Sequence, residues 1–232
     1  MDNYKNNADK LLYDFGLLNE LNNYGTPYIV GSYAMDLMAW NDLDIYVSNE
    51  SMSTEKLYEL TSFILNTFHP VWYEAKKEVS DGKTVWFHGF ETKILGELYN
   101  VDVWFFDKDT ITKALDFSMN IKQKLLVNPE LKEIVINIKQ SLIENEQYGF
   151  DKFSSMDVYK AVFEDNVRSY REFTEKYGVT YQAVSKWENG KNLPSIEMLN
   201  KLSKTLNCTV DYLIGKSDIK NESSQIFGFD KK

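Results

Sequence analysis

The sequence predicts an α+β domain with a mixed sheet, followed by a small all-α domain. Runs typical of strands occur only in the first half, and from about Ser154 the pattern consists of short helices. The charge is divided in the same way: residues 1–150 hold 13 Lys/Arg and 23 Asp/Glu, whereas residues 151–217 have a net charge of +1. We therefore expect domains over 1–150 and 151–217 and a polar tail over 218–232.

Composition limits the class of protein. A hydrophobic fraction of 43% and an aromatic fraction of 15% are enough for a packed core and argue against disorder. The single cysteine, Cys208, excludes an internal disulfide and a cysteine-based zinc site. The start has no apolar signal region and no run approaches the length of a membrane span, so we expect a cytoplasmic protein without a membrane partner.

The first half alternates helices and strands before a run of strands. Leucines and Phe15 at helical spacing predict a helix over 4–23, and Ser53 is a suitable N-cap for a helix over 54–68. Asp81-Gly82 predicts a hairpin. The strands are expected at 27–30, 43–47, 71–79, 84–92 and 97–106. The remaining helices of this half are expected at 33–40, 110–125 and 130–147.

The second half is expected to be wholly helical. Gly149 and the polar residues before it mark a domain boundary. The short helices are expected near 155–165, 169–177, 180–189, 195–206 and 209–214.

Two carboxylates lie on one face of the second strand. Side chains alternate along a strand, so Asp42, Asp44 and Tyr46 share a face and the apolar residues between them point to the core. Neighbouring carboxylates repel each other, but they suit Mg²⁺, which takes one or two carboxylates plus phosphate oxygens and water. A Gly31-Ser32 turn follows the first strand, and Asp102 is a single carboxylate among the apolar residues of the 97–106 strand.

The order Gly31-Ser32, Asp42, Asp44 and Asp102 resembles that of the nucleotidyltransferase superfamily with the polymerase-beta-like fold, in its small bacterial type. The resemblance covers about residues 10–147. It implies that the three aspartates are catalytic and hold two Mg²⁺ ions, and that an NTP such as ATP is the substrate. Gly31 and Ser32 would bind the triphosphate, and Asp102 would help to deprotonate the attacking hydroxyl.

Other polar and aromatic residues have less specific interpretations. His69 and His88 are each more typical of a packed or exposed histidine than of a catalyst, and Trp86 is more typical of a core residue. Asp36 is expected at the surface, and Glu97 beside the metal strand is not expected to be catalytic.

The segment from Phe173 to Pro194 resembles the helix-turn-helix of phage repressor and Cro proteins, the xenobiotic response element family. It reads FTEKYGVTYQAVSKWENGKNLP. The resemblance places DNA-contacting residues near the start of a recognition helix. They are Thr180, Tyr181, Gln182, Ser185, Lys186, Asn189 and Lys191. Gln182 suits adenine, whereas Lys186, Asn189 and Lys191 suit phosphates. Arg168, Tyr170 and Thr174 depart from the family pattern, and a docking module is the alternative.

Together the two halves predict a Mg²⁺-dependent enzyme that moves an NMP from an NTP to a hydroxyl or phosphate acceptor, coupled to a DNA-binding domain that regulates transcription. The expected partners are an NTP and double-stranded DNA, with a homodimer possible. Two alternatives stay open: a transcriptional regulator whose first domain only senses a ligand, and a toxin–antitoxin-type component.

Overall fold

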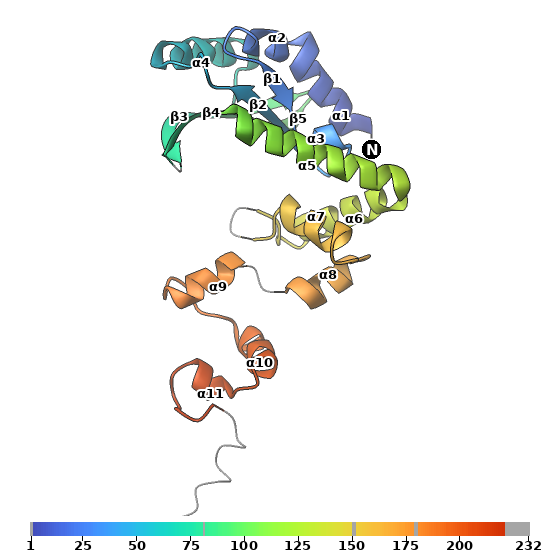
Figure 1. Ribbon diagram of the computed structural model, residues 1–232, viewed down its shortest axis with the longest axis vertical. Helices are drawn as coiled ribbons and strands as arrows, with labels where there is room; N and C mark the ends of the chain where they lie inside the picture. The colour runs from blue at the N-terminus through green and yellow to red at the C-terminus, as the bar shows by residue number, and fades with distance from the viewer. Residues whose placement is uncertain (1, 81, 150–151, 179–180, 221–232) are drawn as a thin grey trace, which may run out of the picture. The chain divides into compact units, whose positions relative to one another are not determined.

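We describe a computed structural model of the chain (Figure 1), which covers residues 2–80, 82–149, 152–178 and 181–220, with the backbone only for 2, 3, 80, 181–183, 197, 201 and 205. The chain divides into two compact units. The larger holds Met1–Tyr148 with Phe153–Lys176, and the smaller holds Gly149–Lys152 with Tyr177–Lys232. The predicted domain boundary near residue 150 stays a prediction. Residues 153–176 belong to the larger unit.

A five-stranded mixed sheet organises the larger unit, as predicted. The strand order is β1-β2-β5-β4-β3, with β2 and β5 parallel and the other neighbours antiparallel. The strands are β1 Pro27–Ile29, β2 Asp42–Ser48, β3 Trp72–Ser80, β4 Lys83–Ile94 and β5 Glu97–Phe106. The central β2–β5 pair joins segments some sixty residues apart, and this pairing decides which side chains meet on the sheet.

One face of the sheet forms the hydrophobic core. Leu43, Ile45 and Val47 of β2 are fully buried, as are their counterparts on β5. The N-terminal helices and α4 (Thr54–Phe68) supply the opposing apolar side chains of this core. The strict alternation of buried and half-buried residues along β2 leaves Asp42, Asp44 and Tyr46 on the other face.

The N-terminal helix is interrupted, which differs from the prediction of one helix over 4–23. It consists of α1 (Asp2–Asp9), a single π-helical turn (Lys10–Asp14) and α2 (Leu17–Leu21). Gly16 causes the break, because its φ of 74° is in the left-handed region that ends a helix. The short helix predicted over 33–40 is α3 (Gly31–Met35), and it ends where Asp36 adopts φ 59°.

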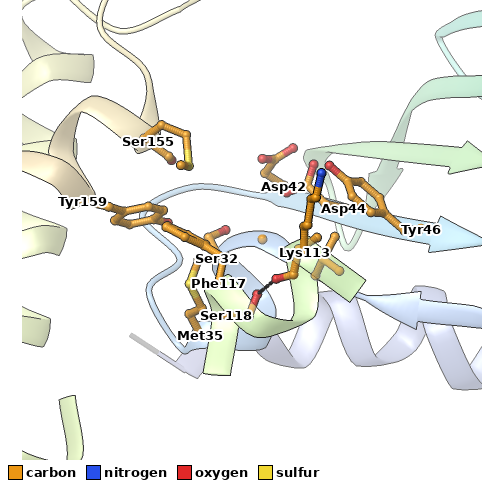
Figure 2. A pocket seen from close by; sticks show the side chains of 14 residues that line it. Ser32, Met35, Asp42, Asp44, Tyr46, Lys113, Phe117, Ser118, Ser155 and Tyr159 are labelled. Atoms are coloured by element: carbon orange, nitrogen blue, oxygen red, sulfur yellow. Dashed lines mark hydrogen bonds between the residues drawn. The ribbon is translucent and has the colours of Figure 1, made fainter. Parts of the chain in front are cut away.

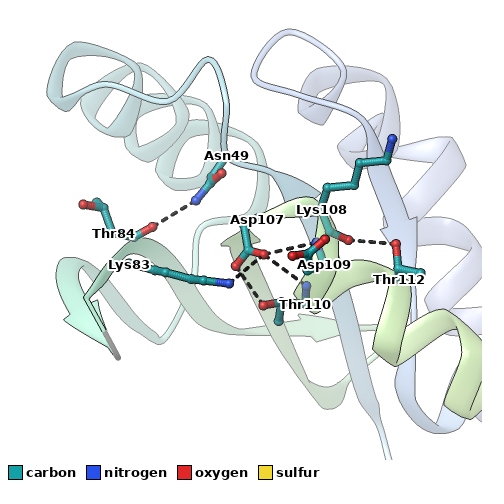
Figure 3. Close-up of polar contacts among 8 residues, drawn as sticks. All are labelled: Asn49, Lys83, Thr84, Asp107, Lys108, Asp109, Thr110 and Thr112. Carbon is teal, nitrogen blue, oxygen red and sulfur yellow. Dashed lines mark hydrogen bonds and ion pairs between the residues drawn. The ribbon is translucent and has the colours of Figure 1, made fainter.

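The long helix α5 (Lys108–Val127) follows the end of β5 directly, and Asp107 fixes its start (Figure 3). The Asp107 carboxylate accepts hydrogen bonds from the amides of Asp109 at 3.1 Å and Thr110 at 3.2 Å. Lys83 of β4 forms an ion pair with it at 3.0 Å. The contacts from Lys83 and Thr110 lower the pKa of Asp107 to about 2. This cap sets the direction in which α5 leaves the sheet.

Three further helices complete the larger unit. They are α6 (Glu130–Glu144), α7 (Ser155–Phe163) and α8 (Tyr170–Tyr177), the last of which continues one residue past the boundary of this unit. A capping box at Ser154 and Asp157 starts α7. Phe153 packs edge-on against Phe173 of α8, with ring centroids 4.9 Å apart. The Lys139 ammonium of α6 donates to the Tyr159 hydroxyl of α7 at 3.4 Å, and the Tyr170 hydroxyl of α8 donates to the Gln147 side chain at 2.9 Å, so both helices are joined to the preceding part of the unit.

The smaller unit contains short helices, as expected for the second half. They are α9 (Tyr181–Glu188), α10 (Ile196–Thr205) and α11 (Val210–Leu213). The Ser195 hydroxyl caps α10 by accepting a hydrogen bond from the Met198 amide. The Thr209 hydroxyl caps α11 by accepting one from the Tyr212 amide. Within the part of the chain that the structure describes, no helix is long and apolar enough to cross a membrane.

We expect Ile45→Ala to destabilise the fold by about 2–5 kcal/mol, because Ile45 is fully buried beside the β2–β5 pairing. Urea denaturation measures this. The control Val79→Ala removes an apolar side chain that is 70% exposed, and it should change stability by no more than about 0.5 kcal/mol. Equal effects of the two substitutions would contradict the core described above.

Candidate active site

The three predicted aspartates meet on the face of the sheet opposite the hydrophobic core. In the parallel pairing of β2 with β5, Asp44 stands opposite Asp102 and Asp42 stands opposite Asn100. Residues opposite one another in a ladder present their side chains on the same face, with neighbouring strands about 4.8 Å apart. The fold therefore brings together the carboxylates that the sequence pattern singled out.

Asp42 is held by its neighbour on β5. The Asn100 amide donates a hydrogen bond of 2.8 Å to the Asp42 carboxylate. Burial raises the pKa of Asp42, while the bond from Asn100 and the charge of Lys139 oppose this increase. Asp42 is thus held in position by the Asn100 amide.

Asp44 and Asp102 are more strongly perturbed. Burial, followed by repulsion from Asp42 and Asp102, raises the pKa of Asp44 to about 8. Burial and repulsion from Asp42 raise the pKa of Asp102 to about 6. Clustered, buried carboxylates with raised pKa values are typical of functional sites, since their ionised forms need a cation that the surrounding protein does not fully supply.

Gly31 makes room for Asp44. Its φ of 64° is in the left-handed region, and an added Cβ would lie 2.1 Å from the Asp44 Oδ2 atom. No side chain fits there, because real Cβ contacts of this kind do not occur below 3.0 Å. The structure thus gives Gly31 a role that the sequence did not indicate: its bare backbone lets the carboxylate lie against the start of α3.

A cavity of about 440 Å³ opens beside these residues (Figure 2). Asp42, Asp44 and Tyr46 line it from the strand, and Gly31 and Ser32 line it from α3. Helix α5 contributes Lys113, Phe117 and Ser118, and α7 contributes Ser155, Met156 and Tyr159. The predicted nucleotide-binding pair and two of the predicted metal ligands therefore share one cleft.

Lys139 of α6 is a site residue that the sequence analysis missed. It is fully buried, and its ammonium donates to the Leu37 carbonyl at 3.0 Å and to the Tyr159 hydroxyl at 3.4 Å. The ammonium also lies 4.5 Å from the centroid of the Trp40 ring. Burial lowers the pKa of Lys139 to about 8, although Asp42 and Asp44 raise it in part. The sequence offered one sign of this role: Lys139 lies among the apolar residues 135, 138 and 142, which share the buried side of α6.

The donor set fits a divalent cation. Among the described residues no three His, Cys, Asp or Glu side chains already converge as metal ligands. Asp42 and Asp44 nevertheless open onto one cavity, and Asp102 lies directly opposite Asp44. Mg²⁺ is usually bound by one or two carboxylates together with substrate phosphates and water, so a complete cage of protein ligands is not required.

Several residues that were not expected to be catalytic do not line the cavity. His88 is fully buried and accepts or donates a hydrogen bond of 2.8 Å with the Tyr73 hydroxyl, and burial lowers its pKa to about 4. Trp86 is in the core. Asp36 is exposed and pairs with Lys132, and Glu97 contacts Asn41 at 3.3 Å.

The predicted DNA-contacting residues fall on and just after α9. Thr180 lies outside the described residues, and of Tyr181 and Gln182 only the backbone is described. Asn189 and Lys191 are exposed, whereas Ser185 and Lys186 are half-buried. The Asn189 amide donates to the Ser185 carbonyl at 2.8 Å.

Comparison with known proteins finds a family match for one segment and a similar fold for the rest of the chain. Residues 168–213 match the HTH_3 helix-turn-helix family. No curated protein matches the chain in sequence.

Solved structures with a similar fold are nucleotidyltransferases. The Cid1 poly(U) polymerase with MgGTP bound has a TM-score of 0.52 at 14% identity, and the match covers 70% of this chain and 50% of that one. A second Cid1 structure, described for its RNA terminal uridylyl transferase activity, has a TM-score of 0.52 at 13% identity, with 70% and 49% covered. This chain spans about half the length of these structures. The chain thus combines a domain of nucleotidyltransferase fold with a segment of the helix-turn-helix family.

Proposed function

We propose that the larger unit transfers an NMP from an NTP to an acceptor hydroxyl or phosphate, with Mg²⁺ bound by Asp42, Asp44 and Asp102. The observation that carries the proposal is the pairing of Asp44 with Asp102 across β2 and β5, beside a cavity that contains Gly31 and Ser32. A ligand sensor needs a pocket, but it does not need three carboxylates in one register. The MgGTP complex of Cid1 supports the choice of a Mg²⁺-bound NTP.

The protein groups have separate roles in this reaction. Bound Mg²⁺ would neutralise the charge that develops on the transferring phosphate. Ser32 faces the cavity and offers its hydroxyl to a phosphate oxygen, and Lys113 offers an ammonium from α5. Asn100 keeps the Asp42 carboxylate in place, and α7 closes the cavity with Tyr159.

The reaction breaks a phosphoanhydride bond of the NTP and forms a new P–O bond to the acceptor. The acceptor oxygen attacks the α-phosphorus of the NTP, a new P–O bond forms, and the bond to the β-phosphate oxygen breaks. Pyrophosphate leaves with that electron pair. The proton of an acceptor hydroxyl passes to the Asp102 carboxylate, which stands opposite Asp44 on the neighbouring strand.

We also propose that α9 and the residues after it bind duplex DNA and that this binding regulates transcription. The family match over 168–213 supports this assignment, and Lys191 and Asn189 are exposed for contact with phosphates. Gln182 is assigned to base recognition, and a homodimer stays a prediction.

Asp42→Asn and Asp44→Asn should each reduce nucleotidyl transfer about 100-fold or more, because each removes negative charge at the cation site. The measurement uses each α-labelled NTP with Mg²⁺ and a cell extract as the source of acceptor. Asp116→Asn is the matched control, since Asp116 is exposed on α5 and does not line the cavity. If no NTP gives transfer with the intact protein while it binds an operator, the regulator is the correct interpretation.

Thermal stability without divalent cations should decrease as the pH rises from 6.5 to 8. Folded Asp44 keeps its proton until about pH 8, whereas the unfolded side chain loses it near 3.8, so the folded state binds more protons and loses stability as pH rises. His88 has the opposite effect only below 6.5, and Lys139 only above about 8. Differential scanning calorimetry should show a decrease of several degrees, smaller in Asp44→Asn and reversed by Mg²⁺. A flat profile would contradict the burial of the Asp44 charge.

Lys191→Ala should weaken binding to duplex DNA about equally for all sequences and reduce the slope of log affinity against log salt by about 1. Lys216→Ala is the control, because Lys216 is an exposed lysine of the same unit that lies away in sequence from α9 and the residues just after it. Fluorescence anisotropy over a salt titration measures both. An unchanged slope in Lys191→Ala would favour a docking module.

A further inference from the structure

A buried loop joins the two parts of the proposed site. This connecting loop, residues 36–41, runs from the end of α3, the helix that carries Ser32, to Asp42 at the start of β2. Residues 37–39 are buried. The Leu37 amide donates to the Ser32 carbonyl at 2.8 Å, so the loop starts against a residue assigned to the nucleotide. Its conformation therefore sets the position of Asp42 relative to Ser32.

Lys139 of α6 contacts the connecting loop at two points. Its ammonium donates to the Leu37 carbonyl at 3.0 Å and lies 4.5 Å from the centroid of the Trp40 ring. A further hydrogen bond of 3.4 Å, to the Tyr159 hydroxyl, joins the ammonium to α7. Leu37 lies near the beginning of the loop and Trp40 near its end. One side chain therefore restrains both halves of the loop.

Trp40 passes this restraint on to Asp42. Burial raises the pKa of Asp42, and hydrogen bonds from the Asn100 and Trp40 side chains are among the interactions that oppose the increase. The indole N–H is the only donor of a tryptophan side chain, so it is the group that faces the carboxylate. The Trp40 ring also packs on Tyr148, with ring centroids 4.3 Å apart. A ring held in this way gives Asp42 a fixed donor.

Lys139 does not reach the cavity. Its side chain is fully buried and is not among the residues that line the cavity, whereas Lys113 lines it from α5 (Figure 2). Among the described residues, Lys139 forms no ion pair with a carboxylate. Burial of such an ammonium is costly, and a methionine would fill the same space without that cost. The contacts of the ammonium are therefore the reason for a lysine at this position.

We propose that Lys139 is a positioning residue for the transfer reaction: through the Leu37 carbonyl and the Trp40 ring, it fixes the Asp42 carboxylate relative to the bound nucleotide. The proposal rests on the nucleotidyl transfer proposed above. Lys139 does not touch the NTP. Its loss therefore changes the alignment of the reacting groups, on which the rate depends steeply, more than the affinity for the nucleotide.

Steady-state kinetics with α-labelled NTP, Mg²⁺ and cell extract separate these two effects. Lys139→Met removes the ammonium and keeps an unbranched side chain. It should reduce kcat about 10-fold or more and change the KM of the NTP by less than about 2-fold. Lys122→Met, at an exposed position of α5, is the control and should change neither. An increase in KM with unchanged kcat would show that Lys139 binds the NTP, and it would overturn the proposal.

A double-mutant cycle tests the path through Trp40. Trp40→Phe keeps an aromatic ring beside the ammonium but removes the N–H, and it should also reduce kcat. Because the two residues act in series, Lys139→Met combined with Trp40→Phe should be no more than about 2-fold slower than the slower single variant. A normal rate in Trp40→Phe, or losses that multiply in the double variant, would overturn the proposal.

Amide hydrogen exchange reads the restraint without any transfer. Lys139→Met should speed exchange in peptides that span 36–41 about 10-fold or more, whereas Lys122→Met should leave it unchanged. Unchanged exchange in Lys139→Met overturns the restraint. If exchange becomes faster as expected, but no NTP gives transfer with the intact protein, the restraint on the loop is supported and the proposed function is wrong.

Discussion

The parallel pairing of β2 with β5 is the constraint on which the site depends. It places Asp44 opposite Asp102 and Asp42 opposite Asn100, and it buries negative charge on the face that the core does not use. Repulsion between buried carboxylates is costly, and Asn100 and Lys139 offset only part of it. The molecule keeps this arrangement although it lowers stability at neutral pH, which is typical of a site built to receive a cation.

Two glycines shape the space on either side of the carboxylates. Gly31 lets Asp44 lie against the start of α3, and Gly89 lets two aromatic rings fold over β4. Gly31 lines the cavity bounded by α5 and α7, and the rings of Trp72 and Phe87 beside Gly89 line a groove over β3, β4 and β5. Asp102 lines this groove and stands opposite Asp44, which lines the cavity. A single strand register thus places these two carboxylates side by side.

Much of this could be predicted from the sequence because it is encoded locally. Alternation along 42–47 predicted which residues share a face with Asp42 and Asp44, and the resemblance to the nucleotidyltransferase superfamily implied Asp102 as their partner. The break at Gly16 was harder to predict, since the apolar spacing continues through it. The role of Gly31 could not be predicted, because the atom that it makes room for belongs to a strand that begins eleven residues later.

Long-range packing accounts for the rest. Lys139 joins the site only because α6 places it beside Leu37 and Trp40, about one hundred residues earlier in the chain. Residues 153–176 resemble part of a separate helical domain in sequence, yet Ser155 and Tyr159 line the cavity. No local sequence pattern predicts such contacts in general. The exception is Lys139, because a lysine among the buried apolar residues of α6 indicates that it has a buried partner.

Proton release on Mg²⁺ binding tests the central claim most directly. Titration calorimetry at pH 7 in buffers of different ionisation enthalpy counts the protons released per cation bound. If Mg²⁺ binds to carboxylates that burial keeps protonated, about one proton is released at pH 7 and almost none at pH 9. Mg²⁺ binding without proton release at pH 7, or no binding in the presence of an NTP, would contradict the account.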